Sequence, residues 1–382
     1  MMLFWKEFKK TAASLFYVVY ILAVIAAYVT QFAPELEEPV AKPVPGLEDY
    51  GTIAKEVPEV LMKEASAGLR EEFLRESYDA YPMGFYREVH LTEEKTKQMK
   101  EVLNGLSTDP LTYERFRELM RRADQLIGGG SRYCDAYLVR YFSNVPKTYE
   151  DALEEYELFL HKDKVMGGYA RLFCDYMGVL VASILPAFLG AALGVKDRRA
   201  KMEEVVHGKA VASFHLIFTR FFAALAAAAL PVVLLAAAAT IQVGKLYPDD
   251  ILDRTAFFRY AGFWLMPQMM VSMAVGMLFS HLADRPVGIL VQGIWWLFAM
   301  WGKTGVLTGS IGRFDLIPRH NSLLKAGEFL DRIGDLAFNR TFYTLLSLGL
   351  VFLTTGIYEQ KRRGKAFGTK RFKNHMPHKS EI

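Results

Sequence analysis

Six stretches of this 382-residue chain contain no aspartate, glutamate, lysine or arginine and are rich in apolar residues. Each has at least the length of about 17 residues that an α-helix needs to cross the hydrocarbon core of a membrane. We therefore predict an all-α, polytopic membrane protein with six transmembrane helices. Their predicted ranges are Thr11–Pro34, Tyr176–Val195, Phe221–Gly244, Tyr260–Ala283, Pro286–Gly302 and Thr341–Tyr358.

The fifth and sixth stretches are the shortest, so each could instead be a helix buried in a protein core. Three tryptophans in the fifth, Trp295, Trp296 and Trp301, favour a membrane location. The first stretch follows three lysines, as the apolar part of a signal peptide does. It is longer than the roughly 7–15 apolar residues of a signal peptide, however, and no small-x-small cleavage site closes it. We expect it to remain as an uncleaved anchor.

Lysine and arginine are concentrated in segments that six crossings would place on one side of the membrane. These segments are 1–10, 196–209 and 359–382. Because cytoplasmic loops carry an excess of these residues, both termini are predicted to be cytoplasmic. We expect a multi-pass protein of the cell membrane, in a bacterium the plasma membrane, with residues 31–171 and 303–340 outside the cytoplasm.

The basic tail, residues 359–382, directly follows the last predicted span. Such a cluster beside a membrane helix is typical of binding to anionic lipid headgroups, at about 1 kcal/mol per charge. The net charge of the whole chain is only +4. We therefore predict that the tail binds membrane lipid and that the chain binds no nucleic acid.

Residues 35–171, between the first two predicted spans, are rich in charge and predict a separate extracytoplasmic domain. A proline-rich linker, residues 34–45, opens it. Because no strand-like alternation of any length is present, we predict a small bundle of about four helices. These are Pro58–Tyr78, Thr92–Leu103, one that has Asp109 as its N-cap and Pro110 as its first residue and ends at Gly128-Gly129-Gly130, and one that begins at Thr148.

The chain has two cysteines, Cys134 in the predicted outer domain and Cys174 at the outer boundary of the second span. In the predicted topology both face an oxidising compartment, which permits a disulfide without requiring one. Two cysteines alone do not fix a Cα separation below about 7 Å, so a bridged and an unbridged pair both stay open.

Sequence motifs for catalysis, metal binding or nucleotide binding are missing. There is no H-E-x-x-H, no G-x-S-x-G, no cysteine cluster and no G-x-x-x-x-G-K-[ST]. His281 with Asp284 could be a ligand or relay pair, but such residues more often cap a helix at the membrane interface. We predict that this chain is not an enzyme and binds no metal or cofactor itself.

Prolines occur inside three predicted spans, at Pro186, Pro231 and Pro267. Each removes a backbone hydrogen bond and bends its helix, which suits helices that move, although proline is also common in static membrane helices. The intramembrane polar residues are Gln268, Gln292 and, at an edge, Arg220. No acid or lysine lies within a predicted span, so the spans lack the ionisable side chains that usually couple transport to protons or sodium. Transport would need another source of energy.

The loop after the second predicted span, residues 196–214, reads KDRRAKMEEVVHGKAVASF. Its first part has a narrow apolar edge and a densely charged face, and Gly208 interrupts it. This pattern predicts a short amphipathic helix at the membrane surface. An ordinary basic flank of a membrane helix would carry the same charge, so the pattern alone leaves both interpretations open.

The whole arrangement resembles an ABC transporter permease of the type-2 exporter family. The resemblance covers nearly the whole chain and is carried by the first segment FWKEFKKTAASLFYVVYILAV, the charged loop, and a last span ending in YEQKRRG. It implies that the loop holds a coupling helix that contacts a separate ATPase subunit, which would bind ATP and magnesium. The residues implied in this contact are Arg198, Arg199, Glu203 and Glu204, and Val205, Val206 and His207 are implied to lie at the end of the coupling helix.

The resemblance also implies a second permease, either the same or a sister chain, and helical segments that dip into the outer leaflet between spans five and six. Ser322–Phe338, within the predicted outer helical loop 303–340, has the apolar face of such a helix. The large insertion after the first span departs from the plainest members of the family. The predicted divisions are 1–34 with the first span, the domain 35–171, the remaining spans in 172–358, and the tail 359–382.

Two functions are compatible with this sequence. The first is the transmembrane subunit of an ATP-driven exporter, working as a dimer with ATPases supplied by another chain. The second is a membrane-anchored sensor or assembly protein whose outer domain binds a ligand or partner. The sensor predicts no ATPase partner and no effect of changes in the charged loop. Neither interpretation identifies a substrate.

Overall fold

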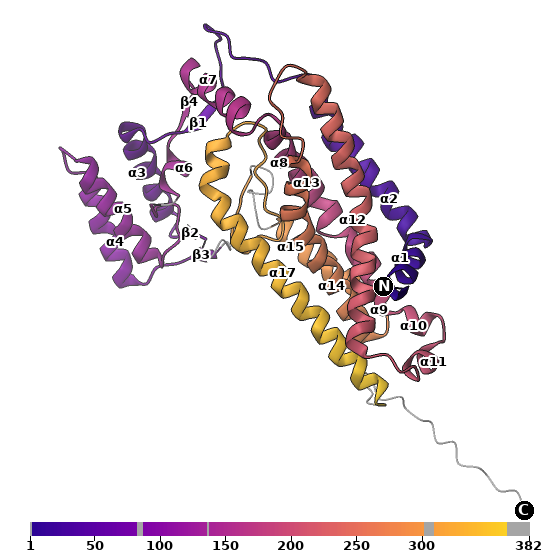
Figure 1. Ribbon diagram of the computed structural model, residues 1–382. Helices are drawn as coiled ribbons and strands as arrows, with labels where there is room; N and C mark the ends of the chain where they lie inside the picture. The colour runs from indigo at the N-terminus through magenta and orange to yellow at the C-terminus, as the bar shows by residue number, and fades with distance from the viewer. Residues whose placement is uncertain (1, 82–86, 136, 302–308, 365–382) are drawn as a thin grey trace, which may run out of the picture.

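The structure is a computed structural model that describes residues 2–81, 87–135, 137–301 and 309–364. These residues are mostly helical, and the long helices form one elongated bundle (Figure 1). Five helices are long and apolar enough to cross a membrane. They are Leu15–Leu36, Met166–Gly194, Ser213–Leu246, Ala256–Ala283 and Ala326–Arg362.

The fifth predicted span, Pro286–Gly302, is not among these five. Its helix, α15 (Val287–Trp301), has 15 residues and is therefore about 22 Å long. A membrane core is about 30 Å thick, so the described part of this helix, which is followed by residues 302–308 outside the described residues, is shorter than a full span. The apolar run was at the lower limit of length, and its first residue, Pro286, lies outside the helix. The described residues thus contain five such helices, and the sixth predicted span is not confirmed.

Three of the five spans are interrupted by a π-helical turn, which shifts the backbone hydrogen bonds by one residue. The turns are Tyr28–Phe32 in the first span, Gly178–Ala182 in the second and Ala261–Leu265 in the fourth. The third and last spans are single helices, α12 (Ser213–Leu246) and α17 (Ala326–Arg362). The α-helical parts of the interrupted spans are α2 (Leu15–Ala27), α8 (Met166–Met177), α9 (Leu185–Gly194), α13 (Ala256–Tyr260) and α14 (Met266–Ala283).

Two of the three prolines proposed as hinges, Pro186, Pro231 and Pro267, lie at these interruptions. Pro186 is at the second position of α9, and Pro267 is at the second position of α14. A proline is tolerated in the first turn because its missing N–H would have no partner there. Pro231, in contrast, lies inside α12, which continues through it without a break.

A short amphipathic helix, α1 (Met2–Ala12), precedes the first span and packs along α12. The hydroxyl of Ser14 accepts a hydrogen bond from the backbone N–H of Tyr17 and so caps the N-terminus of α2. The first span therefore begins at Leu15, four residues later than the predicted Thr11.

Glycines allow α9 and α14 to pack at very short range. A Cβ atom on Gly190 would lie 2.1 Å from the carbonyl oxygen of Met273, and one on Gly276 would lie 2.3 Å from that of Ala187. Gly288 of α15 approaches Gly276 equally closely. Small residues in membrane helices let backbones approach in this way. The second span, the fourth span and α15 are thereby held in fixed positions.

The chain between α15 and α17 enters the bundle as irregular backbone. Leu316 and Ile317 are buried against Val271 and Val275 of α14. Irregular backbone at membrane depth is tolerated only where other protein groups form hydrogen bonds with its N–H and C=O groups or bury it. The predicted outer helical loop 303–340 therefore divides into three parts. Residues 303–308 lie outside the described residues, 309–325 are irregular, and the rest is the beginning of α17.

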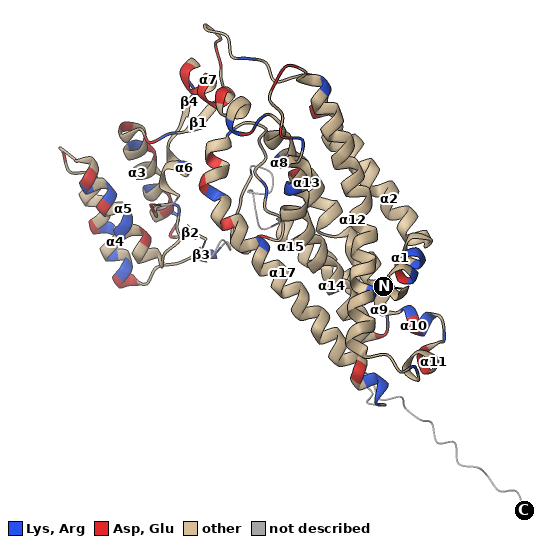
Figure 2. Cartoon of the chain, viewed as in Figure 1, with Lys and Arg blue, Asp and Glu red and all other residues tan. Residues whose placement is uncertain are grey.

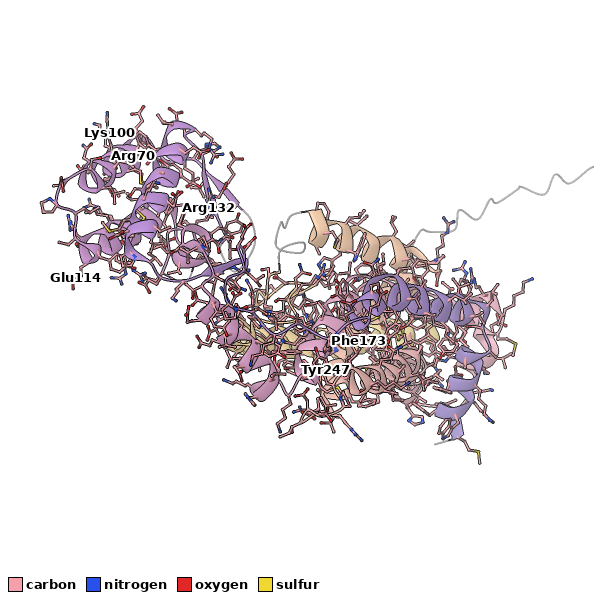
Figure 3. The ribbon with its side chains drawn as sticks, turned by 90° about the horizontal axis from the view of Figure 1, so that it is seen from above. Arg70, Lys100, Glu114, Arg132, Phe173 and Tyr247 are labelled. Atoms are coloured by element: carbon pink, nitrogen blue, oxygen red, sulfur yellow. The ribbon has the colours of Figure 1, made fainter. Side chains whose placement is uncertain are left out.

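The segment between the first two spans has a hydrophobic core of its own, formed by residues from Leu61 to Leu138. Figure 3 shows this segment beside the bundle, with Arg132 in the segment and Phe173 and Tyr247 in the bundle. Its helices are α3 (Pro58–Leu74), α4 (Glu93–Leu106), α5 (Tyr113–Ile127), α6 (Leu138–Phe142) and α7 (Tyr149–Glu157). It also has two antiparallel ribbons, which the sequence analysis did not predict. These pair β1 (Thr52–Ala54) with β4 (Asn144–Pro146), and β2 (Tyr78–Ala80) with β3 (Arg87–Val89).

Most helix ends of this segment agree with local sequence signals. Gly128 ends α5 in the left-handed conformation, with φ of 113°. Thr148 begins α7 with a capping box that it completes with Asp151. The N-cap of α5, however, is Thr112 and not the predicted Asp109. The Thr112 hydroxyl accepts a hydrogen bond from the N–H of Arg115, so the helix begins after Asp109-Pro110.

Both cysteines are within the described residues, and no disulfide joins them. Cys174 is fully buried in α8, among apolar residues of the main bundle core. Cys134 lies in the intervening segment and is partly buried. The disulfide that the sequence left open is therefore not formed.

Candidate functional site

The charged loop emerges at the end of the bundle that also carries α1 and the end of α17 (Figure 1). We call this the loop end, and the opposite end, where the intervening segment joins the bundle, the domain end. Charged residues gather towards both ends, and the middle of the spans is almost free of them (Figure 2). The loop forms two short helices, α10 (Lys196–Arg199) and α11 (Glu203–His207), in place of the one predicted.

The seven residues assigned to the ATPase-coupling loop divide into two groups. Glu203, Glu204 and Val205 are exposed on α11. The other four contact this protein itself. Arg198 forms an ion pair of 2.9 Å with Asp284, and the Arg199 guanidinium lies over the Phe16 ring. Val206 packs against the main bundle core, and His207 meets the ring of Tyr358 edge-on, with centroids 5.2 Å apart.

A buried ion cluster, not predicted from the sequence, attaches the loop to the third span. Arg220 of α12 donates to both carboxylate oxygens of Asp197, at 2.7 and 2.8 Å. Glu7 of α1 bonds Lys196 and lies 3.9 Å from Arg220. Glu7 and Arg220 are only 3% and 7% exposed. One sequence signal pointed to the cluster: Glu7 is the only acidic residue among the first 34 residues.

The charge of Glu7 is stabilised despite its burial. Burial by itself would raise the pKa of this carboxyl, but its hydrogen bond to Lys196 and the nearby charges of Lys196, Arg220 and Lys10 outweigh that effect. The net result is a pKa below the ordinary value. Glu7 is therefore ionised at neutral pH and belongs to the ion cluster as a carboxylate.

The end of the last span holds the loop from its other side. Arg362 donates to the backbone carbonyls of His207, Lys209 and Val211, at 2.8–2.9 Å. Lys361 forms an ion pair of 2.6 Å with Asp284, which follows α14. The loop is thus bonded to α1, α12, α17 and the end of α14.

A second buried polar cluster lies at the domain end. Arg171 of α8 forms two hydrogen bonds with Asp163, at 2.6 and 2.5 Å, and its guanidinium lies 4.9 Å from the centre of the Phe329 ring. Asp175, one turn further along α8, accepts backbone N–H bonds from His320 and Asn321, at 2.7 and 2.6 Å. The irregular segment 309–325 is therefore anchored to the second span by a buried carboxylate.

Side chains of the cluster also bond the carbonyls near the π-helical turns. Arg340 of α17 is 2% exposed and donates to the Trp264 carbonyl, at 2.8 Å. Gln268 donates to the Gly178 carbonyl, at 2.9 Å, and Trp296 to that of Val179, at 2.7 Å. Helix interruptions leave carbonyls that need new partners. Here the partners are side chains of the fourth span, of α15 and of α17.

The surroundings of His320 give the domain end a pH dependence. Burial, followed by the nearby charge of Arg171, lowers the pKa of His320 to about 4. The folded protein then binds fewer protons here than the unfolded chain, whose histidine pKa is about 6.5. We expect the melting temperature to fall as the pH drops from about 6.5 towards 4, and to fall less in His320→Gln. Equal losses in both proteins between neutral pH and pH 4.5 would contradict this assignment.

Among the residues that the structure describes, no group of three or more histidines, cysteines and acids lies together. His281 and Asp284, the pair considered as ligands, have other contacts. The His281 Nδ1 atom lies 3.2 Å from the Gly194 carbonyl oxygen, and Asp284 pairs with Arg198 and Lys361.

Comparisons with known proteins give no family assignment. No protein-family model, no curated protein and no solved structure matches the chain. The function must therefore be argued from the loop end and the domain end themselves.

Proposed function

We propose that this chain is the transmembrane subunit of an ATP-driven exporter, with energy supplied by a separate ABC ATPase. The observation that carries the proposal is the two-sided character of the loop. Glu203, Glu204 and Val205 are exposed, while neighbouring residues of the loop are bonded to α1 and to three spans. A loop that only connected two helices would not need these buried bonds.

The exposed side of the loop offers a compact surface for a partner. Two adjacent carboxylates, Glu203 and Glu204, lie between the exposed apolar residues Met202 and Val205, which are 44% and 51% exposed. This combination fits a cleft that has basic groups at its rim and apolar groups inside. In the proposal, the cleft belongs to the ATPase, which also binds the ATP and magnesium.

The inner side of the loop would transmit movement of the ATPase to the spans. A displacement of α10 reaches α12 through Asp197 and Arg220, and reaches the end of α14 through Arg198 and Asp284. A displacement of α11 reaches α17 through Arg362. The buried, charge-assisted bonds between Asp197 and Arg220 resist separation more than the exposed pair of Arg198 and Asp284 does.

The interruptions in the second and fourth spans are where such movement would change the shape of the bundle. Each combines a π-helical turn with a proline, Pro186 or Pro267. Helices bend at such positions because the backbone hydrogen bonds are already shifted there. Pro231 lies in an unbroken helix and is the weakest of the three proposed hinges.

The proposal includes a membrane topology and an assembly. Both termini and the loop would lie in the cytoplasm, as the excess of lysine and arginine at the loop end favours. The domain end and the intervening segment would then lie outside the cytoplasm. A second permease, identical or a sister chain, would complete the pathway, and the basic tail would contact lipid.

The intervening segment gives the alternative function its support. It has a separate hydrophobic core, and its contacts with the bundle include a bond from Arg140 to the Gly309 carbonyl and the stacking of Arg332 with Tyr137. Such a domain could bind a ligand and signal through the spans. A membrane sensor of this kind would need no ATPase.

The proposal is tested by co-purification with the ABC ATPases of the same cell in detergent, using wild type and Glu203→Arg/Glu204→Arg. We expect wild type to retain one ATPase and the variant to bind it at least about tenfold more weakly. Placing two positive charges against a basic rim should oppose binding by more than about 1.4 kcal/mol. Stimulation of ATP hydrolysis should be lost in parallel.

The control is Glu93→Arg/Glu94→Arg, which reverses two adjacent exposed glutamates in the first turn of α4. It makes the same change of charge far from the loop, so ATPase binding should be unchanged. If no ATPase is retained by wild type, or if both double variants bind equally well, the sensor becomes the better description.

A further inference from the structure

The third span contains a proline that does not break it. Pro231 lies inside α12, which continues from Ser213 to Leu246. Proline has no backbone N–H, so the carbonyl oxygen of Ala227, four residues earlier, lacks the donor that it would have in an ordinary helix. Ala227 and Pro231 are both buried in the bundle. A buried carbonyl without a partner costs free energy, so this one needs a donor from elsewhere.

The first span supplies that donor. The hydroxyl of Tyr17, in α2, donates to the Ala227 carbonyl oxygen at a distance of 2.9 Å. The Tyr17 side chain is itself buried, so its hydroxyl also needs a partner inside the protein. One bond between two spans thus satisfies two buried polar groups. It falls on the carbonyl that loses its helical donor because of Pro231.

A second tyrosine of α2 bonds the next carbonyl. The buried Tyr20 donates its hydroxyl to the Ala228 carbonyl oxygen, also at 2.9 Å. The donor four residues after Ala228 is Val232, which has a backbone N–H. A carbonyl oxygen has two lone pairs and can accept both bonds. The two tyrosine bonds are therefore alike in length and burial, but only the Ala227 carbonyl lacks a helical donor.

The sequence of both helices explains how the hydroxyls reach the backbone of α12. Residues 226–229, directly before Leu230 and Pro231, are all alanine. Small side chains on a membrane helix let a neighbouring helix approach its backbone closely. In α2, which packs beside α12 (Figure 1), the buried residues recur at helical spacing and form one face. These are Tyr17, Tyr20, Val24 and Ala27.

Polar contacts also join the first segment of the chain to the third span on either side of Pro231. Towards the loop end, Glu7 of α1 lies 3.9 Å from Arg220 of α12. Towards the domain end, the Tyr28 hydroxyl donates to the Gln242 side-chain oxygen, at 2.7 Å. The first span therefore follows the third span along its length, and the Tyr17 bond lies between these two contacts.

We propose that Tyr17 and Pro231 form a joint between the first and third spans. In this joint the Tyr17 hydroxyl replaces the helical hydrogen bond that Pro231 removes, and so keeps α12 continuous. If Tyr17 withdraws, α12 bends at Pro231, the position where a proline kinks a helix. The position of the first span thereby controls the bend of the third. The joint does not rest on the proposed exporter function, because it is argued only from contacts within the bundle.

The test is a double-mutant cycle of Tyr17→Phe and Pro231→Ala, measured as melting temperatures of the full-length protein in detergent. Alanine favours a helix, so Pro231→Ala should fold, and its new N–H can serve the Ala227 carbonyl. In the wild-type background, Tyr17→Phe should lower the melting temperature by about 3 °C. In the Pro231→Ala background it should lower it by about 1 °C or less. Equal losses in both backgrounds would overturn the proposal.

Tyr20→Phe is the matched control, because it removes an equivalent hydroxyl from a carbonyl that keeps its helical donor. We expect this change to lower the melting temperature by the same amount with Pro231 and with alanine at that position. If the losses from both tyrosine changes shrink together in Pro231→Ala, the substitution has moved α2 as a whole. Tyr17 would then have no special relation to Pro231, contrary to the proposal.

The bend itself can be measured with spin labels at two exposed positions near the ends of α12, His215→Cys and Ile241→Cys, in a Cys134→Ser background. In a continuous helix these positions are about 39 Å apart. With Tyr17→Phe we expect a broader distribution of distances that extends to shorter values. Adding Pro231→Ala should restore the narrow distribution. A distribution that Tyr17→Phe leaves unchanged would contradict the joint, whether or not an ATPase binds the loop.

Discussion

Replacing Arg220 by methionine is expected to destabilise the protein by about 3–5 kcal/mol, the usual penalty for breaking a buried ion pair. Its guanidinium neutralises Asp197 and lies 3.9 Å from Glu7, and these two side chains are only 15% and 4% exposed. Without Arg220, Asp197 remains in a poorly hydrated position without its bidentate partner. The loop should also detach from the third span. Thermal unfolding in detergent and the yield of monodisperse protein are the measurements.

Arg198→Met is the control for this prediction. Arg198, in α10, is also an arginine paired with an acid, Asp284, but its side chain is 55% exposed. Exposed pairs contribute about 0–1 kcal/mol, and Lys361 still neutralises Asp284 in the variant. Similar losses of stability in Arg198→Met and Arg220→Met would show that burial of the cluster is not what matters.

Replacing Gly276 by alanine is expected to destabilise the bundle by about 3 kcal/mol, at the upper end of typical overpacking penalties. The new Cβ atom would lie 2.3 Å from the carbonyl oxygen and 2.8 Å from the Cα atom of Ala187. Both are backbone atoms, so no side-chain rotation relieves the contact and α9 must move away from α14. Gly190→Ala should have a similar effect, since its Cβ would lie 2.1 Å from the Met273 carbonyl oxygen.

Gly349→Ala is the matched substitution in α17, where a Cβ atom would meet nothing within 4 Å. Because alanine favours a helix over glycine, this variant should be unchanged or slightly more stable. Unfolding temperatures of the three variants, measured side by side, separate the effect of close packing from that of helix propensity. A stable Gly276→Ala protein would mean that α9 and α14 are further apart than described.

The centres of the spans could be predicted from the sequence, but their ends could not. The run Thr341–Tyr358 is the middle of α17, and Tyr176–Val195 is the second part of the span Met166–Gly194. The predicted spans stopped at charged residues such as Asp175 and Arg340. In the structure, Asp175 accepts backbone N–H bonds from His320 and Asn321, and Arg340 is bonded to neutral oxygens, so both helices continue past them.

The candidate site was predicted only in its exposed part. The charge and the apolar edge of α11 are visible in the local sequence. Its exposed residues, Glu203, Glu204 and Val205, are among those predicted. The bonds that hold the loop involve residues far apart in the chain. Lys196 and Glu7, for example, are 189 residues apart. Nothing in the local pattern around either residue indicates the other.

By itself, the sequence determined that this protein is helical and has several segments long enough to cross a membrane. The free energy of transferring apolar side chains out of water adds up along a segment of about 20 residues. It can therefore be judged from the sequence of that segment alone. Only the tertiary structure decided that irregular backbone enters the bundle between α15 and α17, and which buried charges are paired. These features depend on which distant groups meet and satisfy one another, because a buried charge or carbonyl is stable only beside its partner.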